Sequence, residues 1–142
     1  MTCTFFGHRV VSEEIKDKLK SIVLNLIECY GVDLFYLGNN GEFDRLALSV
    51  LKELKQDFPK INYVIVLAYL NDKKSTELYK IGEKTLYPEG IECVPLRFAI
   101  SKRNEWMIKN SDMVVTYVKW SGGAEKFKCL AEKMGKDIFE IS

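Results

Sequence analysis

The spacing of apolar residues changes between a helical and a strand period along the chain, which predicts helices and strands in alternation. Apolar residues recur three and four positions apart over residues 15–27 and again over residues 43–54, so both segments are predicted to be amphipathic helices. We expect Ser12 to cap the first helix and Gly31 to end it, and the second helix to stop before Pro59.

Short apolar runs rich in β-branched and aromatic residues predict the strands. They cover residues 3–6, 34–37, 61–68, 113–118 and 137–141. The run at 61–68 is continuously apolar, which is typical of a strand buried on both faces of a parallel sheet.

Two further helices, over residues 98–110 and from a glycine turn to about Lys133, complete the alternation. This order predicts an α/β protein of one domain, residues 1–142, a three-layer αβα sandwich with a mainly parallel five-stranded sheet. Residues 71–95 do not fit the pattern, apart from a short helix near residues 75–80. This segment is either a lid or binding loop, or a surface excursion without a ligand role.

Composition narrows the classes of partner. Lysine plus arginine (21) nearly equals aspartate plus glutamate (20), whereas a protein that binds duplex DNA usually carries a basic excess. The four cysteines are far apart and the chain has one histidine, so we expect no metal site, and reduced cysteines packed as small apolar residues. The longest apolar stretch, residues 63–70, is too short to cross a bilayer and no secretion signal is visible, so a cytoplasmic protein without membrane contact is expected.

The strongest candidate for a binding site is the turn between the strand at 113–118 and the last helix. Its residues are Ser121, Gly122, Gly123 and Ala124. Glycines let the backbone turn sharply and approach a ligand, and the first N–H groups of a helix lack partners within it, which favours phosphate or carboxylate. Gly7, His8 and Arg9 leave the first strand in a similar way, so we predict one crevice for a phosphorylated small molecule.

Two polar residues near these turns have alternative roles. His8 either contacts phosphate or ribose, or forms a hydrogen bond with nearby backbone. Asp44 follows a second turn that contains Gly38, Asn39 and Gly41, and it either accepts a hydrogen bond from a ribose hydroxyl or complements the helix dipole.

Arg103 and Asn104 share a helical stripe with two apolar residues, Ile100 and Met107. A buried arginine is costly without a partner, so an anionic group should lie close to it. We expect this stripe to face the crevice and Arg103 to meet a ligand. The alternative is an internal salt bridge, for example to Asp112 or Asp44.

Catalytic patterns are scarce. The sequence shows neither the Walker pattern nor G-x-G-x-x-G, which argues against a kinase or an ordinary dinucleotide oxidoreductase, and we expect no resident cofactor. It also shows no serine–histidine–acid order and no convincing pair of carboxylates. Whether the protein is an enzyme is therefore left open.

Short motifs form an ordered set from the first strand to the last helix. They are Thr4-Phe5-Phe6-Gly7-His8-Arg9, Gly41-x-Phe43-Asp44, Arg103-Asn104-x-x-Met107, Ser111-Asp112 and Gly122-Gly123. This set resembles the SLOG superfamily, and most closely its small YpsA-like branch. The superfamily also contains the DprA-type DNA-processing proteins and the Lonely Guy phosphoribohydrolases.

The resemblance implies a Rossmann-like fold that binds nucleotides or nucleotide-derived ligands, such as ADP-ribose-type molecules, at the glycine turns. By position, it implies that the pocket is lined by Gly7, Arg9, Gly41, Asp44, Arg103, Asn104, Gly122 and Gly123.

The chain departs from the Lonely Guy pattern P-G-G-x-G-T-x-x-E. Ser121 replaces the proline, and Cys129 replaces the acid expected to take part in glycosidic cleavage. We therefore expect a protein that binds or senses a nucleotide-like ligand, of the nucleoside phosphate, ADP-ribose or NAD class. The alternative is an N-glycosidic phosphoribohydrolase acting on nucleoside monophosphates, in which Arg103 holds the substrate and Glu125 assists.

A further alternative is binding of single-stranded nucleic acid, with Tyr79, Tyr87 and Trp120 as the side chains that stack on bases. The balanced charge argues against it. Trp106 or Trp120, if exposed, would mark the contact of a homodimer.

Overall fold

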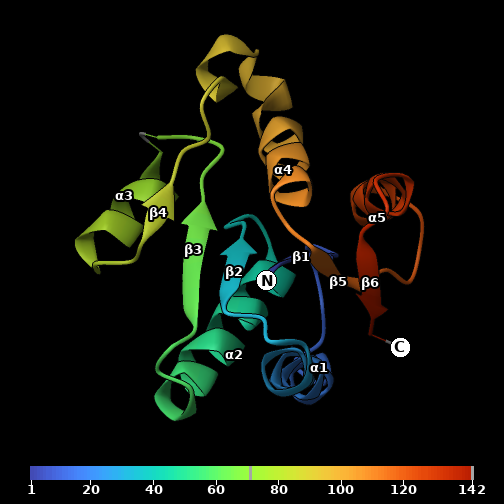
Figure 1. Cartoon of the computed structure of the whole chain (residues 1–142). Coiled ribbons are helices and arrows are strands. Elements are labelled where there is room, and N and C mark those ends of the chain that lie inside the picture. The colour runs from blue at the N-terminus through green and yellow to red at the C-terminus, as the bar shows by residue number, and fades with distance from the viewer. Residues whose placement is uncertain (71, 142) are drawn as a thin grey trace.

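The sheet of this protein contains six strands within residues 1–70 and 72–141, which are the residues that the computed structural model describes. All neighbouring strands run parallel, in the order β4-β3-β2-β1-β5-β6 (Figure 1). The strands are β1 Thr2–Gly7, β2 Leu34–Leu37, β3 Asn62–Val66, β4 Thr85–Leu86, β5 Met113–Tyr117 and β6 Asp137–Glu140.

Helices cover both faces of this sheet, which confirms the predicted three-layer α/β fold of Rossmann-like type (Figure 1). On one face lie α1 Ile15–Tyr30 and α2 Glu42–Asp57, and on the other lie α4 Ala99–Lys109 and α5 Gly123–Lys133. The remaining helical elements are α3 Lys73–Lys80, η1 Ile91–Cys93 and η2 Leu96–Phe98.

Successive residues of the central strands point into opposite layers. Phe5 stacks on Phe35, with ring centroids 5.9 Å apart, in the core beneath α1 and α2. Its neighbour Phe6 stacks on Phe127 of α5, with centroids 5.6 Å apart, in the core on the other face. A strand buried on both faces therefore explains the continuous apolar runs in the sequence.

The sixth strand, β4, was not predicted, and the expected count of five was too low by one. β4 has only two residues and lies in the segment 71–95, whose first residue, Asn71, is outside the described residues, as is Ser142 at the end of the predicted domain. Its neighbours supply carbonyl groups to the edge of β3: Ile65 N–H donates to Lys84. A strand this short has no apolar period from which it could be predicted. The short helix expected near residues 75–80 is confirmed as α3.

The start of α1 and the burial of the cysteines differ from the predictions. The helix α1 begins at Ile15 with Glu14 at its cap position, whereas Ser12 accepts hydrogen bonds at its Oγ from Glu14 N–H at 3.2 Å and at its carbonyl from Ile15 N–H at 3.3 Å. Gly31 ends α1 as predicted, with φ of 70°. The expectation that the cysteines pack as small apolar residues holds for the buried Cys3, and it is wrong for the three exposed ones, Cys29, Cys93 and Cys129.

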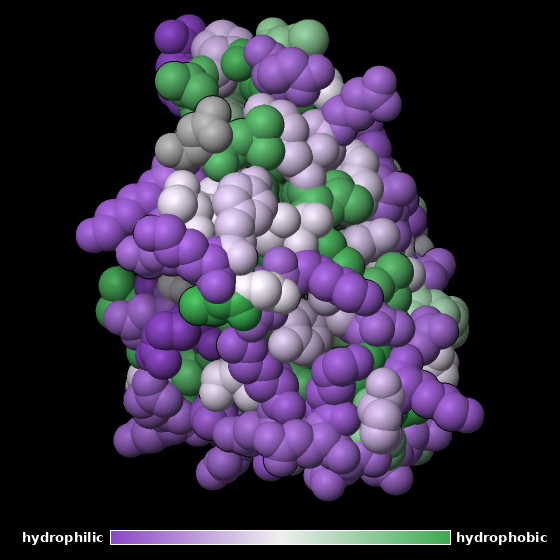
Figure 2. Space-filling model, turned by 90° about the vertical axis from the view of Figure 1, so that its left-hand side faces the viewer, coloured by the Kyte–Doolittle hydropathy of each residue, from purple (hydrophilic) through white to green (hydrophobic). Residues whose placement is uncertain are grey.

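The surface is mixed in character. Figure 2 views the molecule from the side of α3 and β4, where hydrophilic residues surround a paler central area with scattered hydrophobic ones. Among the described residues, no helix has both the length and the apolar character that spanning a membrane requires.

Strand order reverses between β1 and β5, and this reversal places the candidate site. The chain runs outward from β1 through β2 to β3 and later returns to β5, on the other side of β1. Gly7 at the end of β1 is paired in register with Tyr117 at the end of β5, so the two segments that follow leave the sheet side by side. Ligands of open parallel sheets bind at such a reversal, outside the carboxyl ends of the strands.

Gly7→Ala is expected to destabilise the fold, because a Cβ at this position would overlap the aromatic ring of Phe43 in the core. Overpacking of this kind costs about 1–3 kcal/mol, measured as the free energy of unfolding in urea. Gly123→Ala is the matched control, since its Cβ would meet no atom within 4 Å, and its effect should stay within about 0.5 kcal/mol. Equal stability of Gly7→Ala and the wild type would contradict the close packing at β1.

Candidate functional site

A cavity of about 580 Å³ lies beside the carboxyl ends of β1 and β5. Its walls come from the exit of β1, the start of α2, the segment from η2 into α4, and the turn that begins α5. Nine of the residues predicted from the sequence line it: Gly7, His8, Arg9, Asp44, Arg103, Asn104, Gly122, Gly123 and Ala124.

The other predicted residues are not among those that line the cavity. Gly38 and Asn39 lie behind it, against the guanidinium of Arg103, and Gly41 caps the start of α2. Ser121 lines a shallow depression on the outer side of the turn instead. Glu125, the acid assigned to the hydrolase alternative, also lines that outer depression and not the cavity.

Sequence reasoning missed several polar lining residues: Asn40, Arg97 and Ser101. Arg97 lies three positions before Ile100 and Ser101 lies three positions before Asn104, so both lie on the face that carries Arg103 and Asn104. Extending that helical stripe by one turn toward the N-terminus would have found Arg97, and counting back three positions from Asn104 would have found Ser101. Asn40 gave no such signal, because Asn-Gly pairs are common in turns.

Arg103 is 2% exposed, and its guanidinium is held by uncharged oxygens. Its Nε donates to Asn104 Oδ1 at 2.7 Å, and its Nη1 donates to the Val66 carbonyl at 3.0 Å. Its Nη1 also reaches Asn39 Oδ1 at 3.5 Å, and its Nη2 reaches Asn40 Oδ1 at 3.1 Å. A guanidinium has five N–H groups, so one N–H on Nη2 has no partner among the described residues.

Neutral oxygens accept from four of the five N–H groups of Arg103, but they do not neutralise its charge. Neither predicted salt bridge forms among the described residues: Asp112 instead accepts a hydrogen bond from Thr2 N–H at 2.9 Å. Burial lowers the pKa of Arg103, opposed by the nearby charge of Asp44. A guanidinium still stays protonated in proteins, so a positive charge remains at the back of the cavity.

Asp44 is the one carboxylate that lines the cavity. Burial raises its pKa, and the opposing influences are Arg103, the hydrogen bond from Asn40 N–H at 3.1 Å, and two more distant cations, Arg9 and Lys74. A Cβ at Gly38 would lie 2.8 Å from Asp44 Oδ2 and 3.0 Å from Arg103 Cζ. Gly38 therefore lets these two side chains of the cavity wall approach each other.

The starts of two helices face this region, but only one is open. At the start of α2, Glu42 N–H donates to the Arg9 carbonyl at 2.8 Å, and Glu42 Oε2 accepts from Val11 N–H at 3.3 Å. At the start of α5, Gly122 provides no side-chain cap, and neither Gly122 nor Gly123 has any atom within 4 Å of a Cβ position. The first N–H groups of α5 are therefore the ones accessible to an anion.

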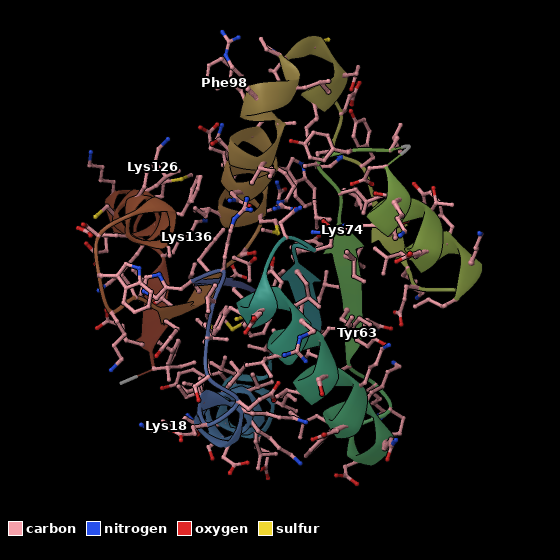
Figure 3. All side chains as sticks on the ribbon, turned by 180° about the vertical axis from the view of Figure 1, so that it is seen from behind. Lys18, Tyr63, Lys74, Phe98, Lys126 and Lys136 are labelled. Atoms are coloured by element: carbon pink, nitrogen blue, oxygen red, sulfur yellow. The ribbon has the colours of Figure 1, made fainter. Side chains whose placement is uncertain are left out.

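Cations dominate the electrostatics of the cavity. Arg9, Arg97 and Arg103 line it together with a single carboxylate, Asp44, and the first two arginines are exposed. Figure 3 shows a further lysine on either side of α4, Lys74 on α3 and Lys126 on α5. The local excess of positive charge favours an anion even though the whole chain is nearly neutral.

His8 and Trp120 form a stacked pair at the edge of the cavity. Their rings are nearly parallel, with an interplanar angle of 6° and centroids 3.8 Å apart. His8 Nε2 accepts a hydrogen bond from Lys119 N–H at 2.7 Å, so the hydrogen bond with backbone predicted as the alternative for His8 is present, while His8 also lines the cavity.

The two tryptophans differ in exposure. Trp120 is 58% exposed and Trp106 is half-buried against Tyr36, and a dimer contact at either residue stays a prediction.

Residues 72–95 contribute no lining residue to the cavity. The lid or binding-loop interpretation of this segment therefore lacks support, and its strand β4 extends the edge of the sheet beside β3.

Asp44→Asn tests the raised pKa of Asp44. Its folded-state pKa lies above the ordinary 3.8, so between these two values the native state binds more protons than the unfolded state. Ionised Asp44 thus destabilises the native state, and this penalty is removed as the pH falls through the folded-state pKa toward 3.8. The free energy of unfolding of the wild type minus that of Asp44→Asn should therefore increase on acidification, in urea unfolding at each pH. A decrease would show that the charge of Arg103 outweighs burial.

The motifs that resemble the SLOG superfamily converge in space. Gly7, Asp44, Arg103 and Gly122, from four separate motifs, line one cavity. No model of a protein family matches the chain, and no curated protein matches it. The superfamily resemblance therefore stays a prediction from the motifs.

Proposed function

We propose that this protein binds a phosphorylated small molecule of the nucleotide class in the cavity, as a binding protein or sensor. Nucleoside phosphates, ADP-ribose and NAD belong to this class. The observation that carries the proposal is the uncapped start of α5, where two open glycines face a cavity with three arginines and one aspartate. Backbone N–H groups at a helix start, with arginines nearby, suit a phosphate group.

The polar residues deeper in the cavity suit the sugar of such a ligand. Asp44, Asn40 and Asn104 offer carboxylate and amide groups, and Arg103 offers one N–H without a partner. Carboxylate and amide oxygens accept hydrogen bonds from hydroxyl groups. The volume of about 580 Å³ lies in the ordinary range for sites that take a small molecule.

The ring pair at the edge suits a nucleobase. One face of Trp120 stacks on His8, while the side chain is 58% exposed. An exposed aromatic face beside a phosphate site favours a nucleotide over a simple sugar phosphate. The resemblance of the motifs to the YpsA-like branch of the SLOG superfamily supports the same class of ligand. The position of Glu125, outside the cavity, favours binding over the hydrolase alternative.

Arg9→Ala and Arg97→Ala should each weaken binding of the tightest ligand in a panel of nucleoside phosphates, ADP-ribose and NAD. A hydrogen bond to a charged group contributes about 1.5–3 kcal/mol, so the dissociation constant from calorimetry should rise roughly tenfold or more. Arg45→Ala is the control, because Arg45 is exposed on α2 and pairs with Glu13 away from the cavity. The proposal fails if no member of the panel binds the wild type.

Gly122→Ala should also weaken binding, because the φ of 150° at Gly122 is strained for a residue with a Cβ. The strain would reorient the first N–H groups of α5. Gly135→Ala is a matched control, since Gly135 also has a positive φ, 73°, and open space, but follows the far end of α5. Both substitutions should lower stability by about 1 kcal/mol, while only the first should lower ligand affinity. Equal effects of the two on affinity would contradict a ligand site at Gly122.

A further inference from the structure

The single histidine of the chain links the exits of β1 and β5. His8 Nε2 accepts a hydrogen bond from Lys119 N–H at 2.7 Å, and the two residues are 111 positions apart. One face of the imidazole stacks on Trp120 at 3.8 Å, and Tyr117 contacts it edge-on at 5.7 Å. These three partners immediately precede the turn that holds Gly122.

We propose that His8 is the positioning residue for the turn at residues 121–123. This inference rests on the proposed anion site at the start of α5. Its neutral imidazole, with the proton on Nδ1, holds residues 117–120 so that Gly122 and Gly123 present their N–H groups to the ligand. Protonation of His8 releases the turn and weakens anion binding.

The hydrogen bond between Lys119 N–H and His8 Nε2 defines the tautomer of the neutral imidazole. A neutral imidazole has one donor nitrogen and one acceptor nitrogen, and because Nε2 accepts from Lys119, the proton lies on Nδ1. Protonation adds a hydrogen to Nε2, which then faces the N–H of Lys119, so two donors oppose each other. The hydrogen bond is lost, and Lys119 and Trp120 are no longer fixed next to Gly122.

The surroundings keep His8 neutral at neutral pH. Its side chain is 7% exposed, and burial lowers its pKa below the ordinary 6.5. The charged and titratable groups near it are Arg9, Tyr117 and Lys119 beside the ring, and Asp44, Arg97 and Arg103 in the cavity.

NMR spectroscopy of the imidazole tests the positioning role without any ligand, and the single histidine makes its signals unambiguous. We expect the Nδ1–H tautomer, a pKa below 6.5, and a change in the Lys119 amide signal with the same midpoint. In a Trp106→Phe variant, which leaves Trp120 as the one tryptophan, the fluorescence should change at that midpoint. An Nε2–H tautomer, or a Lys119 amide that does not follow the titration of His8, would overturn the proposal.

Two substitutions separate the hydrogen bond from the ring. His8→Gln places an amide oxygen near the position of Nε2, where it accepts from Lys119 at every pH. His8→Phe keeps a ring for Trp120 but has no acceptor. The probe is inorganic sulfate, whose charge stays constant between about pH 5 and 8, the range in which His8 titrates.

Sulfate affinity of the wild type should fall about two- to tenfold on acidification through the pKa of His8, the size expected for one lost hydrogen bond. The affinity of His8→Gln should be independent of pH, and that of His8→Phe should be weak throughout. A wild-type affinity that rises on acidification would show that the imidazolium itself binds the anion, and would overturn the proposal. A His8→Gln variant that titrates like the wild type would do the same.

Failure of the proposed function is recognised separately. If sulfate and the nucleotide panel do not bind at any pH, the anion site is wrong, whereas the role of His8 in holding the turn is still decided by the Lys119 amide and the Trp120 fluorescence. Thermal unfolding of each variant checks that it is folded. If His8→Phe does not fold, the comparison of the wild type with His8→Gln still decides the outcome.

Discussion

A buried positive charge at the reversal of strand order organises this molecule. Arg103 is 2% exposed at the wall of the cavity, and its guanidinium binds oxygens from α4, from the turn after β2 and from the end of β3. These oxygens accept from four of its five N–H groups without neutralising its charge. Asp44 offsets part of the charge and is itself held by Asn40 N–H. Because a buried charge requires this much support, the walls of the cavity and the positive charge within it have the same origin.

The glycines at the strand exits have different physical roles, although they look alike in sequence. Gly7 lacks a Cβ because Phe43 occupies that space, and Gly38 lacks one because Asp44 and Arg103 meet there. Gly122 and Gly123 have open space instead. Packing alone therefore accounts for the first two, whereas the second two are accessible to a ligand.

The two helix starts near the cavity also differ in whether their first N–H groups already have a partner. The first N–H of α2 is used by the Arg9 carbonyl, which ties the exit of β1 to α2 and fixes the wall that carries His8 and Arg9. The start of α5 is left free, and His8 holds the segment that precedes it through Lys119 and Trp120. The exit of β1 is thus tied to α2 by a backbone hydrogen bond, while in our proposal the segment before α5 depends on the protonation state of His8.

The sequence by itself determined the alternation of strands and helices, the parallel sheet, and the stripe from Ile100 to Met107 that faces the cavity, because these follow from local periods of apolar residues. Only the tertiary structure decided that Asn40 supports Arg103, that Gly7 makes room for Phe43, and that Gly122 rather than Gly41 begins the open helix. Such contacts join segments tens of residues apart. They depend on how the connections between strands pack, and the local spacing of apolar residues does not predict that packing.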